Sequence, residues 1–580
     1  MARAPQITVV GGGLAGLMTV IKAAEAGADV KVFSSVPCKR SHSVCAQGGI
    51  NAAVNTKGEG DSPDIHFDDT IYGGDFLAEQ DLVRRMCYAA PGIIYLLDRM
   101  GVRFSRTPEG LIDFRRFGGT RHHRTAFAGA TTGQQLIYAL DEQVRRWEAE
   151  GRVARYENWE FLDAVLDDGG VCRGIVAMNL AHLKPEAFRA DAVVMATGGP
   201  GAIFGRSTNS LNCTGSAAGA IFRQGVIYAN PEFIQVHPTA VPGEDKNRLI
   251  SESVRGEGGR MWVPRDGKPW YFLEERFPKY GNLVPRDVAT REVFQVVFEE
   301  NLGIDGEPQV YLDVSHLDPV TTRRKLGGVL EIYEKFVGDD PTRVPMRVFP
   351  SVHYSMGGLW VDHENEMTNV PGLFASGEAN HQYHGANRLG ANSLMSCIFG
   401  GMVAGPAAVR WSRNLETSSD AVDGSVFEAA RIRVHERVRA MTARSGPENP
   451  FRLHEELGKM MTKHVTVIRK NAGLDEAAEK LKEIKERMAR ITVPDRADFG
   501  NPALVFSLQM ENMLEIAETI VKGARLRDES RGAHYKPEFP RRDDEHFLKT
   551  TLAKWTPDGP EISYQRVECK HIPPRQRKYD

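Results

Sequence analysis

An apolar run near the N-terminus, ITVV at 7–10, is typical of a strand buried in a parallel sheet. A helical pattern follows it, and then a second predicted strand, DVKVF at 29–33. Residues 14–26 overlap the end of the glycine-rich GGGLAG and have the spacing of a helix. This order predicts a βαβ unit. A further strand is predicted at 191–199, where DAVVMATGG again ends in a glycine loop.

The pattern changes twice further along the chain. Residues 240–345 mix polar turns, aromatic residues and short helices, which indicates an inserted domain. From about 406 to 535 the pattern is helical, and residues 474–491 carry an apolar stripe at spacings of three and four. The stripe consists of Leu474, Ala478, Leu481, Ile484, Met488 and Ile491. The segment after 536 is rich in Pro, Arg and Asp and is predicted to lie extended over a surface.

The glycine loop that follows the first strand has the pattern GxGxxG, at Gly11, Gly13 and Gly16. The first glycine permits a tight turn, the second lets the backbone approach a pyrophosphate, and the third lets helix and strand pack closely. The motif alone is weak evidence, but its place in a βαβ unit favours dinucleotide binding. The acidic residue expected after the second strand is absent, since Ser34 and Ser35 stand there, and NAD is therefore not favoured.

Together these patterns predict an α/β fold built on a Rossmann-like dinucleotide-binding domain. We expect that domain to be discontinuous, comprising residues 1–238 and 346–405. An α+β capping domain is expected at 239–345, a helical domain at 406–535 and an extended C-terminal segment at 536–580.

Composition narrows the class of protein. A length of 580 residues implies several domains, and a formal net charge of −3 gives no argument for nucleic acid binding. The seven cysteines are scattered without a CxxC pair, which suits a reducing compartment and argues against an iron–sulfur cluster of the usual spacing. No run of about 18 uninterrupted apolar residues is present, so we expect no membrane-spanning segment and no signal peptide.

His42 lies in SHSVCAQGGI, directly after the second predicted strand. At that point of a dinucleotide fold the chain passes a flavin ring, and an imidazole nitrogen is a competent nucleophile for attachment to the ring methyl group. The alternative is a capped turn with a surface histidine. Position alone leaves both open.

Further histidines and arginines recur in glycine-rich, polar contexts. Together they suit a small anion with two carboxylates, because guanidinium forks and imidazole N–H groups both bind carboxylate. They are His237, Glu252, Arg255, Arg286, His353, His384 and Arg388, where Glu252 accompanies the basic residues. Each arginine taken singly could instead form a surface ion pair. Their spacing resembles no metal site, and we expect His66, His122 and His123 to be non-catalytic.

The motifs GGGLAG, RSHSVCAQGG, ATGG, HPTA, RGEGG, VPRDVATRE, HYSMGG and HGANRLGANSL follow one another in a fixed order. In this order the chain resembles the flavoprotein subunits of succinate dehydrogenase and fumarate reductase, from about residue 6 to the RDDE after SRGAH. Details such as NPEFIQVHPTA look most like the bacterial, menaquinone-linked enzymes that pair with a di-haem cytochrome b.

The resemblance implies roles for individual residues. His42 would carry FAD covalently, Phe117 would lie near the substrate, and Arg286 would transfer the proton with Glu252 and Arg255 as a relay. The dicarboxylate would be bound by His237, Ser251, Glu252, His353 and Arg388. FAD would also contact Gly11, Gly13, Gly16, Ser34, Ser43, Gln47, Gly48, Gly49, Glu378, Ser393 and Leu394. Ser251 replaces a threonine found in many members, and Ser216 replaces an acidic flavin ligand, so we leave Ser216 out of the site.

The implied function is interconversion of succinate and fumarate, with hydride transfer to the flavin and proton transfer through Arg286. Electrons would pass to an iron–sulfur subunit, and through a cytochrome b anchor to menaquinone. The chain would lie at the cytoplasmic face of the bacterial inner membrane, held there by its partner subunits. Two alternatives remain. One is an L-aspartate oxidase-like flavoenzyme, which lacks the covalent histidine, and the other is a non-catalytic flavin electron carrier.

Overall fold

A parallel sheet of five strands forms the centre of the N-terminal half in this computed structural model, which describes residues 3–579. Its order is β19-β10-β1-β2-β6, and all neighbouring strands are parallel. The strands are β1 (Gln6–Val10), β2 (Asp29–Ser34), β6 (Val153–Glu157), β10 (Ala192–Met195) and β19 (Leu373–Ala375). Helix α1 (Leu14–Glu25) connects β1 to β2, which confirms the predicted βαβ unit.

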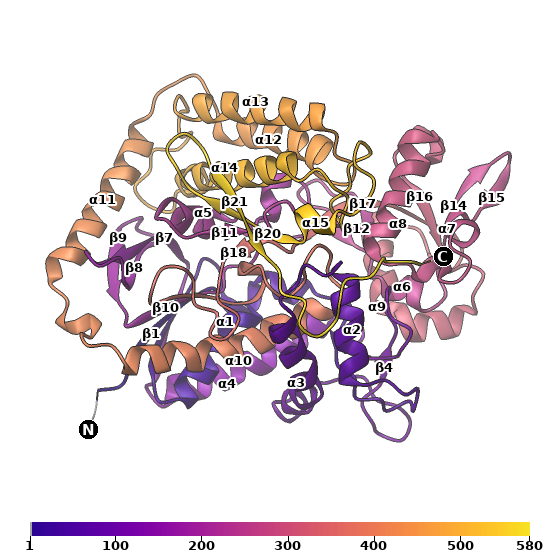
Figure 1. The fold of residues 1–580 in the computed structure, drawn as a ribbon, viewed down its shortest axis with the longest axis horizontal. Coiled ribbons are helices and arrows are strands. Elements are labelled where there is room, and N and C mark those ends of the chain that lie inside the picture. Colours follow the sequence, from indigo (N-terminus) through magenta and orange to yellow (C-terminus); the bar gives the residue numbers. More distant parts are fainter. Residues whose placement is uncertain (1–2, 580) are drawn as a thin grey trace.

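The apolar run of β1 reflects burial of its last four residues, because helices cover the sheet. Helix α1 packs against α10 (Asn392–Arg413), from a distant part of the chain (Figure 1). Within residues 3–579, α10 alone is long and apolar enough to cross a membrane by length and composition. Its most apolar window is 72% buried inside the protein, as in a core helix.

The segment predicted as an insertion extends a six-stranded sheet of order β13-β12-β17-β16-β14-β15. The antiparallel strands β12 (Ile234–Val241) and β17 (Met346–Ser355) lead into and out of the insertion. The other strands are β13 (Arg248–Leu249), β14 (Arg260–Arg265), β15 (Lys268–Trp270) and β16 (Val310–Asp313).

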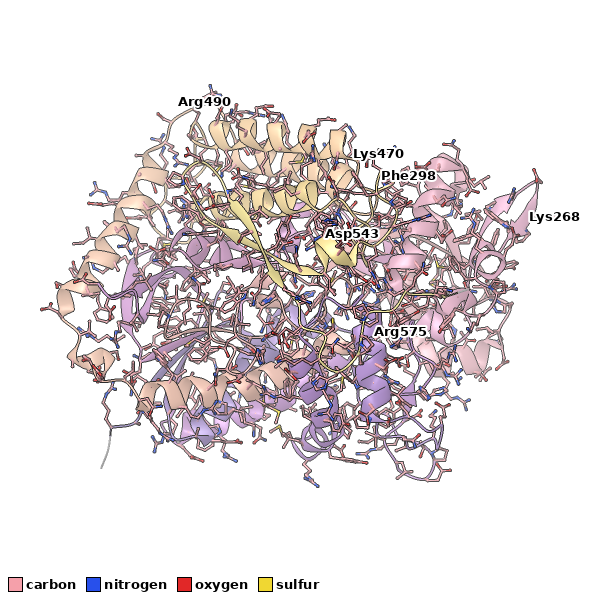
Figure 2. The ribbon with its side chains drawn as sticks, viewed as in Figure 1. Lys268, Phe298, Lys470, Arg490, Asp543 and Arg575 are labelled. Carbon is pink, nitrogen blue, oxygen red and sulfur yellow. The ribbon has the colours of Figure 1, made fainter. Side chains whose placement is uncertain are left out.

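Four helices accompany this sheet: α6 (Ser253–Gly256), α7 (Phe272–Arg276), α8 (Arg286–Phe294) and α9 (Pro319–Val337). The insertion has its own cluster of buried apolar side chains, among them Val263, Leu312 and Leu330. Lys268 marks its outer side in Figure 2. Because β12 runs across position 238, the proposed boundary there divides a strand rather than a loop.

Helices follow from α10 onward, as the pattern predicts: α11 (Gly424–Ala443), α12 (Pro450–Val465), α13 (Asn471–Met488) and α14 (Pro502–Leu526). The proposed boundary at 405/406 falls inside α10, at Pro406. One member of the predicted stripe is wrong, since Ala477 is buried on α13 whereas Ala478 is exposed. At 3.6 residues per turn, Ala477 lies within about 20° of the buried Ile484 and Met488 around the helix axis, whereas Ala478 lies about 120° and about 80° from them.

The C-terminal segment is only partly extended. It forms α15 (Asp544–Phe547) and a hairpin of β20 (Lys549–Lys554) and β21 (Glu561–Arg566), and β20 pairs with β11 (Tyr228–Ala229). The hairpin turn is TPDG, in which the N–H of Gly559 donates to the carbonyl of Thr556 over 3.1 Å. This is a common turn sequence, and it was a signal available in the sequence. After β21 the chain runs past α2 (Pro63–Gly73) and ends beside the insertion (Figure 1).

Candidate active site

Two cavities meet at a common wall formed by His42, Ser43, Glu378 and Cys397. The first cavity follows the glycine loop between β1 and α1. The second lies between that wall and the insertion and is lined by basic side chains. Their contact allows one extended ligand to reach from the glycine loop to the edge of the second cavity.

The first cavity has a backbone that only glycine can form. Gly11 has φ of +118°, and a Cβ added to it would collide with the carbonyl oxygen of Ala196. A Cβ on Gly16 would collide with the carbonyl oxygen of Gly11. Gly13 precedes α1, so the first helical turn directs its N–H groups toward the cavity, where they suit a pyrophosphate. The first of them, on Leu14, donates to Ser43 Oγ over 3.2 Å.

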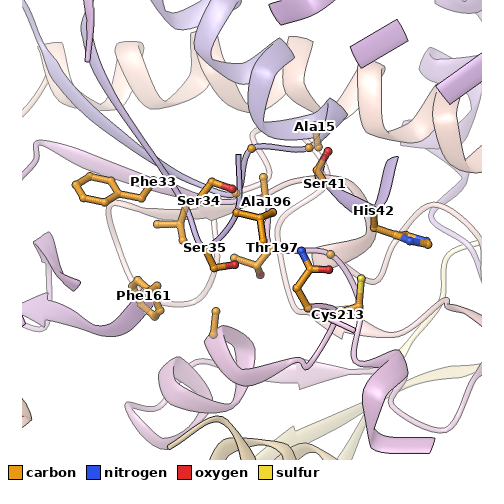
Figure 3. A pocket seen from close by; sticks show the side chains of 18 of the residues that line it. Ala15, Phe33, Ser34, Ser35, Ser41, His42, Phe161, Ala196, Thr197 and Cys213 are labelled. Carbon is orange, nitrogen blue, oxygen red and sulfur yellow. The ribbon is translucent and has the colours of Figure 1, made fainter. Parts of the chain in front are cut away.

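Small hydroxyl groups lie beside the glycine loop in the first cavity, where a Cβ on Gly12 would lie 3.0 Å from Ser34 Oγ. Figure 3 shows Ser34 and Ser35 at the end of β2, with Thr197 nearby and His42 on the other side of the cavity. Serine at the end of β2 can bond a ribose hydroxyl. Ser216, which we had left out of the site, also lines this cavity, and its hydroxyl accepts a hydrogen bond from Asn512 Nδ2 over 3.0 Å.

His42 stands on a short 3₁₀ turn (His42–Cys45) in the wall between the cavities. The backbone N–H of Ser210 donates to His42 Nδ1 over 3.1 Å, and Asn209 Nδ2 lies 3.3 Å from Nε2. Burial and the nearby charge of Lys246 lower the pKa of His42 to about 4. The imidazole is therefore neutral near pH 7 and retains a nucleophilic lone pair.

The glycine pair after Gln47 brings the backbone close to an aromatic ring. A Cβ on Gly48 would lie 2.8 Å from Phe117 Cζ, so the Phe117 ring packs directly on this backbone. Gly49 has φ of +132° and leaves no room for a side chain against Ala126. Gln47 Nε2 donates to Leu249 O over 3.1 Å, while its buried Oε1 has no partner within the protein. That oxygen is free to bind a ligand.

A buried carboxylate connects two arginines in the second cavity. Glu252 Oε2 accepts from Arg286 Nε over 2.6 Å, and Oε1 accepts from Arg255 Nη2 and from Gly118 N, each over 3.0 Å. Burial alone would raise the pKa of the Glu252 carboxyl, but Arg286 and Arg255 outweigh it and lower this pKa below its ordinary value. Glu252 is therefore ionised at neutral pH.

A single amide oxygen joins Arg286 to Arg388. Gln235 Oε1 accepts from Arg286 Nη1 over 3.1 Å and from Arg388 Nη2 over 2.9 Å. Arg388 Nη1 also donates to Ser393 Oγ over 3.3 Å, and its buried Nε has no partner within the protein. Burial and the charge of Arg286 lower the pKa of Arg388 to about 9. Gln235 lies in QVHPTA, and no other feature of the sequence indicated a role for it.

Two histidines complete the basic lining. The rings of His237 and His353 lie 5.1 Å apart, edge to face. His237 Nδ1 accepts from the N–H of Thr239 over 3.2 Å, which leaves its buried Nε2 without a partner. His353 Nδ1 lies 2.7 Å from Thr208 Oγ1. Burial and the neighbouring charges hold the pKa of both imidazoles well below the ordinary value. A bound dianion would oppose this effect.

The other residues predicted to contact FAD or substrate also line these cavities. Ser251, Ser393 and Leu394 line the second cavity, and Glu378 lines both. Burial raises the pKa of the Glu378 carboxyl to about 7, although its Oε1 accepts from Ser355 N over 3.0 Å.

Four histidines named in the sequence lie outside the residues that line the two cavities. His384 packs behind Tyr354 and bonds Ser396 Oγ at 3.0 Å, so its inclusion in the basic set was wrong. The other three are His66, His122 and His123. Within residues 3–579, no group of three or more His, Cys, Asp or Glu could hold a metal ion.

A glycine loop at a helix N-terminus, joined to a basic cavity across a neutral histidine, defines a flavin-dependent oxidoreductase. A family model described as "FAD binding domain" matches residues 6–394, and one described as "Fumarate reductase flavoprotein C-term" matches residues 454–579. The chain is 62% identical to the succinate dehydrogenase flavoprotein subunit of Bacillus subtilis, over 99% of this chain and 98% of that protein.

More distant relatives indicate the same family. The fumarate reductase flavoprotein subunit of Escherichia coli is 35% identical over 99% of this chain and 95% of its own length. A solved structure of E. coli quinol fumarate reductase superposes with a TM-score of 0.91 and 33% identity, covering 99% of this chain and 98% of that chain. The chain belongs to the family of flavoprotein subunits of succinate dehydrogenase and fumarate reductase, and it binds FAD. This assignment favours the succinate–fumarate reading over the aspartate oxidase and electron-carrier alternatives.

Proposed function

We propose that the second cavity binds succinate or fumarate and interconverts them. The observation that carries the proposal is the charge of one buried cluster, in which Arg286 and Arg388 line the cavity and Arg255 lies behind it. Within residues 3–579 only one carboxylate, Glu252, pairs with any of these three arginines. The cluster has two positive charges in excess, which match a dicarboxylate dianion. A buried charge is costly unless it is paired, so the site is complete only with such a ligand.

Binding is assigned to the side chains that still lack partners. Arg388 Nε and His237 Nε2 have no partner within the protein, and we assign them to hydrogen bonds with the substrate carboxylates. His353 and Ser251 line the same cavity and are assigned to the same role. Phe117 and Leu394 supply apolar surface for the methylene carbons and help to exclude water.

Proton transfer is assigned to Arg286, with Glu252 and Arg255 as the relay. An arginine is a poor base in water, so it can serve only if another group restores its proton state as the substrate changes. Glu252 is hydrogen-bonded to both guanidinium groups, and Arg255 continues the path to Asn282 O over 2.7 Å. Bound FAD supplies the hydride acceptor for succinate oxidation, or the donor for fumarate reduction.

We propose that His42 attaches FAD covalently through Nε2. The Ser210 N–H occupies the lone pair of Nδ1, so Nε2 carries the proton of the neutral ring and gives it up as the bond to the flavin forms. An imidazole substituted at Nε2 keeps its lone pair on Nδ1, and the hydrogen bond from Ser210 is retained after attachment.

We further propose that electrons leave through an iron–sulfur subunit and a cytochrome b anchor to menaquinone. The chain would then be peripheral at the cytoplasmic face of the membrane. Support comes from relatives named as subunits and from a structure titled as quinol-fumarate reductase with menaquinol molecules.

Dye-linked turnover with purified wild-type chain tests the substrate assignment. We expect succinate to reduce the dye, and reduced dye to drive fumarate reduction, while L-aspartate gives no turnover. Turnover with aspartate and none with succinate would reject the proposal.

Acid precipitation tests the attachment separately. We expect a yellow, fluorescent pellet from wild type and a colourless pellet from His42→Ser. Flavin in the wild-type supernatant would reject covalent attachment without touching the substrate assignment.

A further inference from the structure

The C-terminal segment approaches the second cavity from behind. It passes α2 and ends beside α8 (Figure 1), and Arg575 marks this crossing in Figure 2. Arg577 then forms a two-pronged ion pair with Asp287, with Nη1 to Oδ2 at 2.8 Å and Nη2 to Oδ1 at 3.1 Å. The two side chains are 9% and 1% exposed. Asp287 follows Arg286 directly on α8.

From Asp287 a chain of amides leads to the active-site arginines. Asn387 Nδ2 donates to Asp287 Oδ1 over 3.1 Å. Asn387 Oδ1 accepts from Gln235 Nε2 over 2.9 Å. Gln235 Oε1 is thereby turned toward Arg286 and Arg388 and accepts from both.

Asp287 is one of three acceptors that set the direction of this chain. Asn387 Nδ2 also donates to Gly73 O over 3.3 Å, and Gln235 Nε2 also donates to Arg388 O over 2.8 Å. An ionised carboxylate can only accept, so a protonated Asp287 would place a donor against Asn387 Nδ2. The resulting shift of Asn387 would pass to Gln235 and to its contacts with the two arginines.

Resting on the proposed function, we propose that Arg577 is a positioning residue for the two active-site arginines. It holds Asp287 as a buried ionised acceptor. Asp287, together with the carbonyls of Gly73 and Arg388, holds Asn387 and Gln235 in place. The oxygen of Gln235 then keeps Arg286 and Arg388 together despite their like charges.

The charges around Asp287 are few. Arg291 Nη2 lies 3.6 Å away, one turn along α8, and Arg577 itself has a second, longer contact with Asp75 at 3.6 Å. Burial alone would raise the pKa of the Asp287 carboxyl, but Arg577 and Arg291 outweigh it and lower this pKa. Without Arg577 the pKa of the Asp287 carboxyl rises. A protonated Asp287 can then turn a donor, instead of an acceptor, toward Asn387 Nδ2.

Arg577→Gln in the full chain with bound FAD tests the proposal, and Arg575→Gln is the matched control. Arg575 lies on the same segment but binds Asp68 and stacks on Tyr72. We expect Arg577→Gln to lower kcat for succinate at least tenfold and to move the acid limb of the kcat/KM profile to higher pH. Arg577→Lys should retain the wild-type pH profile. Arg575→Gln should stay within twofold of wild type at every pH.

A second variant covers the case in which Arg577→Gln does not fold. Asp287→Asn is nearly isosteric and removes the ionisable acceptor, so we expect a lower kcat and a kcat/KM profile without the part of the acid limb that Asp287 sets. Wild-type kcat and pH profile in Arg577→Gln, or in Asp287→Asn, would overturn the proposal.

The affinity for malonate, a dicarboxylate dianion, separates the proposed function from the positioning role of Arg577. It is measured by calorimetry. If the wild-type chain neither oxidises succinate nor binds malonate, the proposed function fails. If it does both and Arg577→Gln is unchanged in turnover and pH profile, only the positioning role fails.

Discussion

Gln235 holds Arg286 and Arg388 together, although the two arginines are 51 and 153 residues away from it in the chain. Its role depends on these two contacts, and it was therefore missed in the sequence. Arg286, Arg388, His237 and His353 line the same cavity, and they were expected from the sequence because basic residues in glycine-rich motifs suit a dicarboxylate. A residue type indicates what a side chain can bind, but its partners are decided by the fold.

Glu366, which lies away from both cavities, allows the effect of burial on a carboxyl pKa and on stability to be tested. It is fully buried and accepts a hydrogen bond from the hydroxyl of Tyr383, and burial raises the pKa of its carboxyl to about 8. A raised pKa means that the folded state holds the proton longer than the unfolded state. The contribution of this group to stability therefore falls as pH rises from about 4.5 to about 8, by at most about 5 kcal/mol.

Glu366→Gln should remove that dependence. We expect the melting temperature of the variant to rise relative to wild type as pH increases from 5 to 8, measured by differential scanning fluorimetry. Glu364→Gln, on the exposed part of the same loop, is the control and should follow wild type. Parallel curves for Glu366→Gln and wild type would contradict the assigned burial effect.

Elements were predicted best where one periodicity ran without interruption. The βαβ unit of β1, α1 and β2 was correct because its strands are buried on both faces and its helix follows a glycine loop. The hairpin β20–β21 was missed because the composition of the segment outweighed its TPDG turn. On α13 the periodicity was right but one position was misplaced.

That misplaced position gives a matched pair of substitutions on α13. Ala477→Asp should place a carboxylate among Leu474, Leu481 and Ile484, at a cost of about 1–3 kcal/mol or more. We expect a melting temperature several degrees lower for this variant, while Ala478→Asp stays close to wild type because its side chain is exposed. Equal effects of the two substitutions would contradict the orientation of α13.

The whole molecule brings together side chains that are far apart in the sequence. β12 and β17 connect the insertion to the FAD-binding part, and they carry His237 and His353 at the junction. Arg286 and Glu252 come from the insertion, whereas Arg388 lies just before α10. The order of motifs predicted which residues take part, but only the packing of the insertion over the common wall shows that they share one cavity.

The role of Arg286 is the central claim, and turnover of Arg286→Gln with bound FAD tests it most directly. Arg276→Gln is the control, because Arg276 lies on the insertion and pairs with Glu292 and Glu300 outside the residues that line either cavity. The account predicts that Arg286→Gln retains FAD and loses at least about 100-fold in succinate turnover, the lower range for loss of a positioned acid–base group. Turnover within tenfold of wild type, with FAD retained, would contradict it.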